Sequence, residues 1–217
     1  MFIQVTTLKI NEIFFSLQGE SSYIGIPTIF IRLTGCPMRC TYCDTAYAFH
    51  DGKKMTIQEI LKEISQYKTK YVTVTGGEPL AQKPCWDLLK DLSDKGYSVS
   101  LETGGAISIE GVDKRTKIIL DIKTPESGES LNNNKKNFSL IDKKDEIKFV
   151  ISNKDDYQWA KKLIEKECLT NKAPVIFSPV YAKLSYEDLS NWILEDSLNV
   201  RFQVQLHKII WGEKKGV

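Results

Sequence analysis

Cys36-Pro37-Met38-Arg39-Cys40-Thr41-Tyr42-Cys43 is the stretch on which the rest of this sequence depends, because it places three cysteines in one short loop. The CxxxCxxC spacing lets three thiolates face inward from that loop, and cysteine sulfur is the natural ligand of iron–sulfur clusters. A four-iron cluster held by three cysteines keeps one iron without a protein thiolate. Open metal positions are typical of catalytic sites, whereas closed ones tend to be structural.

Two other interpretations of the loop stay open. A structural zinc site needs a fourth ligand, and His50 is the only candidate in reach. Disulfides are disfavoured because the chain has five cysteines, an odd number, and no secretory signal. The remaining two, Cys85 and Cys168, fall in helical patterns, where we expect ordinary buried or part-buried thiols.

Composition predicts an ordinary soluble protein. A chain of 217 residues suits a single domain, with 41% apolar and 27% charged residues. Its 30 Lys and Arg against 28 Asp and Glu leave a net charge of +2, which gives no case for a nucleic-acid or membrane partner. The start, Met1–Val5, lacks the features of a signal peptide, and free cysteines indicate a reducing compartment, the cytoplasm.

Short apolar runs alternate with helical patterns, which predicts an α/β fold. The expected strands cover residues 5–15, 28–34, 71–75, 97–101, 117–122, 146–151, 174–177 and 200–206, and the expected helices cover 56–64, 84–95, 155–169 and 186–196. Strands separated by helices pair in parallel through crossovers. The parallel part of the sheet would then have six or seven strands, which are too few for a closed eight-stranded barrel.

We therefore expect one domain, residues 1–217, built as a partial, open barrel with an N-terminal strand extension; a doubly wound sheet is the alternative. Residues 1–25 would supply that strand and a turn that contributes to the site. Residues 126–138 are polar and read as a loop. Thr56, with Glu59 at the capping-box position, should begin the first helix.

Small or polar strings follow nearly every expected strand. They are Thr34-Gly35-Cys36, Thr75-Gly76-Gly77-Glu78-Pro79, Glu102-Thr103-Gly104-Gly105, Asp121-Ile122-Lys123-Thr124-Pro125, Ser178-Pro179-Val180-Tyr181 and Gln205-Leu206-His207. Loops at the carboxyl ends of parallel strands converge on one face and form the site. We expect these strings to surround the cysteine loop, although capping and turn formation explain many such residues equally well.

Four further positions carry chemistry of their own. Arg32 lies in an apolar strand, so its guanidinium must pair either with an internal carboxylate or with a substrate carboxylate. Thr45 could cap the next turn or ligate a hard cation, and chemistry alone favours the cap. Gln205 and His207 alternate on the last expected strand and would share a face, although a lone histidine is more often structural.

The motifs together resemble a known family. The CxxxCxxC loop resembles the radical S-adenosylmethionine (SAM) superfamily, in which SAM chelates the fourth iron. The full set also closely resembles the 7-carboxy-7-deazaguanine synthase family from about residue 10 to the C-terminus. It consists of Phe15-Ser16-Leu17-Gln18-Gly19-Glu20, the cysteine loop with Asp44-Thr45, Thr75-Gly76-Gly77-Glu78-Pro79, Glu102-Thr103, Asp121-Ile122-Lys123-Thr124-Pro125 and Gln205-Leu206-His207-Lys208.

The resemblance implies a homodimeric carbon–nitrogen lyase of the cytoplasm, in the deazapurine pathway that leads to queuosine in tRNA. It would convert 6-carboxy-5,6,7,8-tetrahydropterin to 7-carboxy-7-deazaguanine with loss of ammonia. Its cofactors would be a [4Fe-4S] cluster, SAM and Mg²⁺. It would need an electron donor such as flavodoxin, and would contact neither nucleic acid nor membrane.

The resemblance also assigns site residues by position. The cluster ligands would be Cys36, Cys40 and Cys43, with Mg²⁺ on Thr45. The SAM contacts would be Tyr42, Asp44, Gly76, Gly77, Glu78, Lys123, Thr124, Pro125 and Ser178. The substrate contacts would be Leu17, Gln18, Gly19, Glu20, Arg32, Thr75 and Val217, with Glu102, Gln205 and His207 as further candidates that could read the edge of a heterocycle.

Two alternatives differ in kind from this enzyme. A radical SAM activase that makes a glycyl radical on a partner protein shares CxxxCxxC and is similarly small. A zinc or iron–sulfur binding module without catalysis would have no affinity for SAM.

Overall fold

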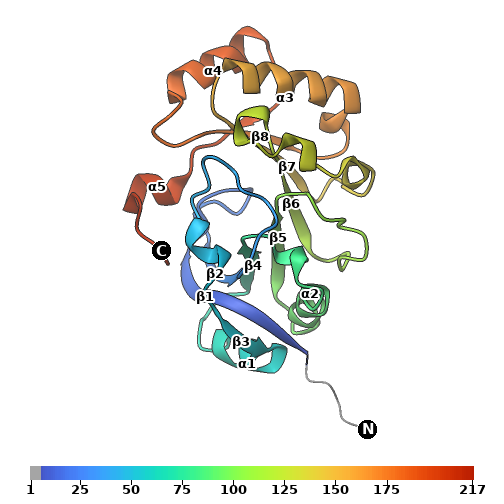
Figure 1. Ribbon diagram of the computed structural model, residues 1–217, viewed down its shortest axis with the longest axis vertical. Helices are drawn as coiled ribbons and strands as arrows, with labels where there is room; N and C mark the ends of the chain where they lie inside the picture. The colour runs from blue at the N-terminus through green and yellow to red at the C-terminus, as the bar shows by residue number, and fades with distance from the viewer. Residues whose placement is uncertain (1–5) are drawn as a thin grey trace.

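A single nine-stranded sheet organises residues 6–217, which are the residues that the computed structural model describes (Figure 1). The strand order is β3-β1-β2-β4-β5-β6-β7-β8-β9. The strands are β1 (Thr7–Leu17), β2 (Pro27–Leu33), β3 (Lys53–Thr56), β4 (Tyr71–Gly76), β5 (Ser98–Thr103), β6 (Lys117–Ile122), β7 (Glu146–Ile151), β8 (Val175–Pro179) and β9 (Arg201–Phe202). The first five residues of the expected 1–25 segment lie outside the described residues.

Strand directions follow the expected pattern. β2 and β4 to β9 run parallel, whereas β1 is antiparallel to β2 and β3 is antiparallel to β1. Because β3 and β9 are opposite ends of the strand order, the sheet is open, as predicted. The antiparallel β1 and β3 are the N-terminal extension, and β3 is a strand that the sequence patterns did not reveal.

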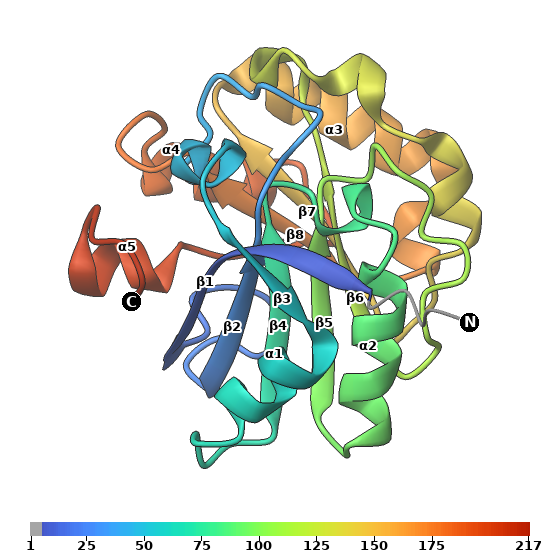
Figure 2. The ribbon, with the colours of Figure 1, turned by 60° about the horizontal axis from the view of Figure 1, so that its bottom comes forward.

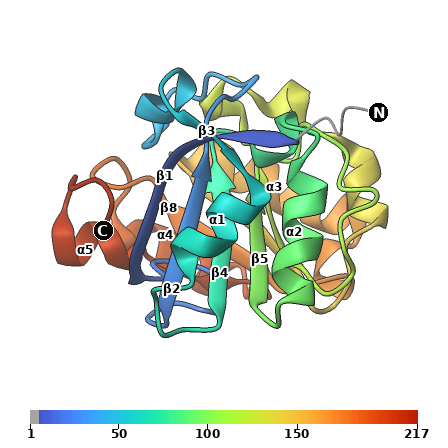
Figure 3. The same cartoon turned by 90° about the horizontal axis from the view of Figure 1, so that it is seen from below.

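Four helices cover the apolar face of the sheet: α1 (Ile57–Ile64), α2 (Cys85–Asp94), α3 (Lys154–Glu167) and α4 (Tyr186–Glu195). A fifth, α5 (Leu206–Trp211), lies on the cavity side. Figure 3 shows α1 and α2 lying against the outer face of β2, β4 and β5. The capping box predicted for α1 is confirmed: Thr56 Oγ1 accepts from Glu59 N at 3.1 Å, and Glu59 Oε2 accepts from Thr56 N at 2.7 Å. None of the helices described is both long and apolar enough to cross a membrane.

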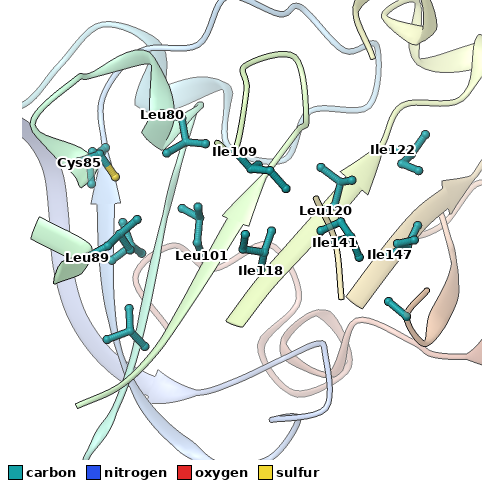
Figure 4. Packing of buried hydrophobic residues seen from close by; sticks show 14 of the residues in the cluster. Leu80, Cys85, Leu89, Leu101, Ile109, Ile118, Leu120, Ile122, Ile141 and Ile147 are labelled. Atoms are coloured by element: carbon teal, nitrogen blue, oxygen red, sulfur yellow. The ribbon is translucent and has the colours of Figure 1, made fainter. Parts of the chain in front are cut away.

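The two faces of each strand differ, because successive side chains point to opposite sides. Leu101, Ile118, Leu120 and Ile147 belong to the buried apolar cluster on the outer side, with Leu89 of α2 (Figure 4). The residues that alternate with them on the strands point inward, and many of these are polar, including Ser100, Glu102, Asp121 and Lys148. Alternation in sequence thus places an apolar core outside the sheet and charged groups inside its curve.

The turn between β1 and β2 reaches across to the far side of the sheet. Ser21 N donates to Gln203 Oε1 at 2.6 Å, and Gln203 Nε2 donates to Ser21 O at 2.9 Å. Ser22 N donates to Glu146 Oε1 on β7 at 3.0 Å. Leu206 N donates to Gly19 O at 3.0 Å. The turn therefore links the first strands to the last ones and holds residues 18–20 under the inner face.

The polar connection between β6 and β7 contains short 3₁₀ helices: η3 (Pro125–Ser127), η4 (Ser130–Asn132) and η5 (Lys135–Ser139). The expected loop at 126–138 lies here, and it is anchored by the buried Asn137. Asn137 Oδ1 accepts from Ile109 N at 3.1 Å, while Nδ2 donates to Gly105 O at 3.1 Å and to Ile107 O at 2.9 Å.

The C-terminal part differs most from expectation. The strand predicted over 200–206 was wrong in extent: β9 covers only Arg201–Phe202, and α5 begins at Leu206. Only two residues find a partner on β8, and the chain then turns back over β1, beside which α5 and the C-terminus lie (Figure 2). The expectation for Cys168 was also wrong, since it is exposed in a left-handed conformation after α3.

Candidate functional site

A cavity of about 490 Å³ opens on the inner face of the sheet, at the carboxyl ends of the parallel strands. Its walls are the cysteine loop, the turn after β1, the ends of β4 to β7, and α5 with the C-terminal segment. Predicted site residues that line it are Leu17, Gln18, Gly19, Glu20, Arg32, Cys36, Cys40, Tyr42, Cys43, Asp44, Thr45, Thr75, Gly76, Gly77, Glu102, Lys123, Gln205, His207 and Val217. The structure thus brings together residues from across the chain.

Backbone hydrogen bonds hold the cysteine loop at the cavity. Thr41 N donates to Ser127 O at 3.1 Å, and Arg39 N donates to Glu129 Oε1 at 2.6 Å. The thiols of Cys36, Cys40 and Cys43 are all partly exposed and line the cavity. Cys85, by contrast, is fully buried in the core.

Burial favours the protonated thiol at two of the three cysteines of the loop. Burial raises the pKa of Cys40 to about 11, against the opposing effect of the Lys123 ammonium. Burial also raises the pKa of Cys36. A thiolate is the form that binds metal, so a cationic metal cluster is the natural counter-charge for this set.

The arrangement suits a cluster better than a single ion. Within residues 6–217, no three His, Cys, Asp or Glu side chains converge as ligands for one metal ion. A tetrahedral zinc site needs such convergence, whereas a four-iron cluster takes each thiolate on a different iron. Three cysteines that line one cavity match the number of protein thiolates that a [4Fe-4S] cluster with one open iron needs.

Gly77 packs against the cysteine loop so closely that no side chain fits. A Cβ at this position would lie 2.3 Å from Gly35 O and 2.8 Å from Cys36 Cβ. Glu78 N donates to Gly35 O at 2.8 Å from the same segment. The glycine therefore brings the end of β4 into contact with the loop.

Replacing Gly77 by alanine is expected to displace the loop, because backbone atoms cannot move aside as a flexible side chain could. We expect the variant to retain less than about half of the iron after anoxic reconstitution, by colorimetric iron assay, and to lose SAM affinity. An alanine variant with wild-type iron and SAM binding would contradict the close contact.

Four of the predicted SAM residues lie off the cavity wall: Glu78, Thr124, Pro125 and Ser178. Thr124 Oγ1 donates to Asp156 Oδ2 at 3.0 Å and is 3.3 Å from the Tyr42 hydroxyl, so it supports a wall residue from behind. Ser178 Oγ is buried and has no hydrogen-bond partner in the part of the chain that is described.

Glu78 is fully buried and its carboxylate is engaged by the protein itself. Oε1 accepts from Leu80 N at 3.1 Å and from Thr103 Oγ1 at 2.9 Å, and Oε2 accepts from Gly104 N at 2.8 Å. Burial raises the pKa of Glu78 even though these donors oppose it. The side chain ties the ends of β4 and β5 together behind the cavity.

Replacing Glu78 by alanine is expected to lower the free energy of unfolding by about 3 kcal/mol, because three buried donors lose their acceptor. Urea denaturation of the protein measures this change. A variant of unchanged stability that failed only to bind SAM would assign the carboxylate to the cofactor instead.

On the inner face, Gln18 and Glu102 form one hydrogen-bonded wall. Gln18 Nε2 donates to Thr73 Oγ1 at 3.0 Å and to Glu102 Oε1 at 3.3 Å. Thr75 Oγ1 donates to Glu102 Oε2 at 3.0 Å. Burial raises the pKa of Glu102, and the neighbouring Glu20 raises it further. The wall can therefore present hydrogen-bond acceptors to a ligand with N–H groups.

Arg32 pairs with an internal carboxylate, which was one of the two partners that the sequence predicted for it. Its Nε donates to Glu12 Oε1 at 2.7 Å, and the Tyr47 hydroxyl donates to the same oxygen at 2.7 Å. Among the described residues, no other N–H group of the Arg32 side chain has a protein acceptor. Because the guanidinium has five donors and lines the cavity, its outer edge can still bind an anion.

Thr45 does not cap the short helix that follows it. It occupies the N-cap position of η1 (Ala46–Phe49) without a side-chain capping bond, so the preference for a cap was wrong. Its hydroxyl is 3.7 Å from Cys43 Sγ and faces the cavity. A hydroxyl in this place is available to a ligand or a hard cation.

Gln205 and His207 reach the cavity from a helix instead of a strand, so the expected shared strand face was wrong. Gln205 precedes α5 and His207 lies in its first turn. A Cβ on Gly19 would lie 2.1 Å from His207 Nδ1, so the imidazole packs directly on that glycine. Burial lowers the pKa of His207, which keeps it neutral at pH 7. Val217 lines the same cavity.

Lys148 and Asp121 are cavity residues to which the sequence reasoning assigned no role. Lys148 lies on β7 and Asp121 on β6, and in both strands the residues on either side of the charged residue are apolar. The signal was present in Glu146-Ile147-Lys148-Phe149-Val150-Ile151, where a lysine interrupts a buried run just as Arg32 does on β2.

The chain matches known proteins over most of its length. The model of the radical SAM superfamily matches residues 30–126. The chain is 44% identical to the 7-carboxy-7-deazaguanine synthase of Chlorobaculum tepidum over 97% of both chains. It is 42% identical to that of Koribacter versatilis, over 97% of this chain and all of the relative.

The fold has a solved counterpart in the crystal structure of QueE from Escherichia coli, with a TM-score of 0.77 at 23% identity. The match covers 93% of this chain and 95% of that one, and it confirms the partial, open barrel of the radical SAM type. With full-length relatives above 40% identity, this chain belongs to the 7-carboxy-7-deazaguanine synthase family of the radical SAM superfamily.

Proposed function

We propose that this protein is a carbon–nitrogen lyase that converts 6-carboxy-5,6,7,8-tetrahydropterin to 7-carboxy-7-deazaguanine with release of ammonia, in the deazapurine pathway that leads to queuosine. One observation carries the proposal: a single cavity joins the three-cysteine loop to Arg32 and to the wall of Gln18 and Glu102. The names of the full-length relatives support the same reaction.

The cysteine loop would hold the cluster and the nearby strand ends would hold SAM. Cys36, Cys40 and Cys43 would be the thiolate ligands, and SAM would lie against Tyr42, Asp44, Gly76, Gly77 and Lys123. Bound there, the reduced cluster and SAM together supply the radical chemistry of the superfamily. The part of the protein is to orient the ligands and exclude water from the cavity.

The opposite end of the cavity would hold the pterin. The free edge of the Arg32 guanidinium suits the 6-carboxylate, since a fork of two N–H groups matches a carboxylate. Gln18, Glu20 and Glu102 supply acceptors for the N–H groups of the aminopyrimidinone ring. Loss of ammonia requires a proton on the leaving amine, and burial, which raises the pKa of Glu102, favours the protonated carboxyl that would supply it.

The finer parts of the proposal rest on the family resemblance. Mg²⁺ would bind Thr45 together with substrate oxygens and offset their charge. The protein would work in the cytoplasm as a homodimer, would receive electrons from a donor such as flavodoxin, and would bind neither nucleic acid nor membrane. Val217 would approach the substrate, because the C-terminal residue lines the cavity.

Turnover of the carboxypterin tests the proposal. Protein reconstituted with iron and sulfide under anoxic conditions is mixed with the pterin, SAM, Mg²⁺ and dithionite, and the deazaguanine is measured by absorbance and mass. We expect product only when SAM and reductant are both present. An intact cluster that cleaves SAM but forms no product would overturn the proposed reaction and favour a different substrate, such as the partner protein of a glycyl-radical activase.

A further inference from the structure

Lys148 is a buried cation inside the cavity. It is 6% exposed, on the inner face of β7. Its Nζ donates to Glu20 Oε2 and lies 4.0 Å from Asp121 Oδ2, which in turn pairs with Lys123 at 3.1 Å. A buried ammonium is costly without partners, so this lysine needs both carboxylates and fixes them in return.

Glu20 has one oxygen to spare for a ligand. Its backbone N donates to Gln18 Oε1 at 3.2 Å, which sets the residue at the base of the cavity. Lys148 takes Oε2, while Oε1 is buried and has no hydrogen-bond partner among the described residues. A carboxylate oxygen at a cavity wall without a donor is satisfied when a ligand brings an N–H group.

We propose that Lys148 is a positioning residue for pterin binding: by holding Oε2 of Glu20 it turns the carboxylate so that Oε1 accepts from an N–H of the aminopyrimidinone edge. This inference rests on the function proposed above, and it names the group that orients the ring. Lys148 itself makes no contact with the ring, because its ammonium is occupied by the two carboxylates.

The charges around Glu20 give the proposal a pH signature. The groups that face it are Lys148 from β7, Asp121 from β6, Glu102 from β5, and His207 with Gln205 at α5. Burial acts to raise the pKa of Glu20, but Lys148 and, to a lesser degree, His207 hold it below its usual value. His207 is largely neutral above its own lowered pKa, so Lys148 is the cation that matters at neutral pH.

Without Lys148, burial and the two neighbouring carboxylates raise the pKa of Glu20. A protonated Glu20 loses the charge that attracts the pterin N–H groups. Binding should then weaken as pH falls through the raised pKa and recover as pH rises above it. If Lys148 served only to stabilise the fold, its replacement would weaken pterin binding, and raising the pH would not restore that binding.

Calorimetric titration of the cluster-reconstituted protein with 6-carboxy-5,6,7,8-tetrahydropterin tests this, in the presence of SAM and without reductant, so that no turnover occurs. For Lys148→Met we expect pterin binding about tenfold weaker than that of the wild type at about pH 6.5. At about pH 9 the two affinities should be close to equal. Lys148→Arg should bind tightly across the range, since the guanidinium keeps its charge.

Matched variants assign the effect. Glu20→Gln should bind the pterin weakly at every pH, and the double variant with Lys148→Met should show no pH dependence. Lys161→Met is the control: Lys161, on α3, pairs with Asp196 at 2.9 Å, and neither residue lines the cavity. It should leave pterin binding unchanged.

Two results would overturn the inference. One is a Lys148→Met variant whose pterin affinity is unchanged or weakened equally at all pH values. The other is a Lys148→Arg variant that keeps its iron and its SAM affinity but binds the pterin as weakly as Lys148→Met does. If wild-type protein binds SAM but not the carboxypterin, the proposed function fails first and this inference fails with it.

Discussion

Replacement of Cys40 by alanine is expected to reduce product formation to background. Cys40 supplies one of the three thiolates at the cavity, and Cys85 and Cys168 lie elsewhere, one in the core and the other on the surface after α3. With two ligands left, a four-iron cluster has two irons without protein thiolates and becomes labile. Iron content and visible absorbance after anoxic reconstitution, with turnover of the carboxypterin, measure the loss.

Cys168→Ala is the matched control for this change. Its thiol is exposed and distant from the cavity walls, so iron content and turnover should equal those of the wild type. If Cys40→Ala kept its iron and its activity, the cysteine loop would have no part in the chemistry and the proposed function would fail.

Replacement of Arg32 by lysine is expected to lower kcat/KM for the carboxypterin by about 100-fold, which corresponds to about 2.7 kcal/mol. Lysine keeps the charge but cannot serve Glu12 and a substrate carboxylate with a planar fork at the same time. Steady-state kinetics should show most of the change in KM, while SAM affinity by calorimetry stays near that of the wild type.

Tyr47→Phe is the control for the structural part of this effect. It removes one donor to Glu12 and leaves the guanidinium in place, so kcat/KM should fall by less than about fivefold. Equal losses in the two variants would mean that the Glu12 cluster matters only for folding. A lysine variant with unchanged KM would place the substrate carboxylate elsewhere.

Local patterns predicted much of this molecule. The capping box of α1, the apolar runs of β2 and β4 to β8, and the strand-end strings were all visible within a few residues of one another. Parallel strands joined by crossovers gather their carboxyl ends at one edge of the sheet, so Gly76, Gly77 and Lys123 could be placed beside the cysteine loop in advance.

Where prediction failed, the deciding contact was distant in sequence. β3 exists because four of its residues pair with β1, and the last expected strand is short because only two residues of β9 pair with β8 before α5 begins. The Glu78 carboxylate accepts from Thr103 and Gly104, which are 25 and 26 residues further along the chain. Nothing within a short window could reveal those partners.

By itself the sequence determined the cysteine spacing, the α/β alternation and the order of the motifs, because each is a property of neighbouring residues. Only the tertiary structure decided that Arg32 meets Glu12 and that Lys148 meets Glu20, 128 residues away in the chain. The physical reason is that a buried charge must find its partner in space, and the folded sheet alone sets which carboxylate is near enough.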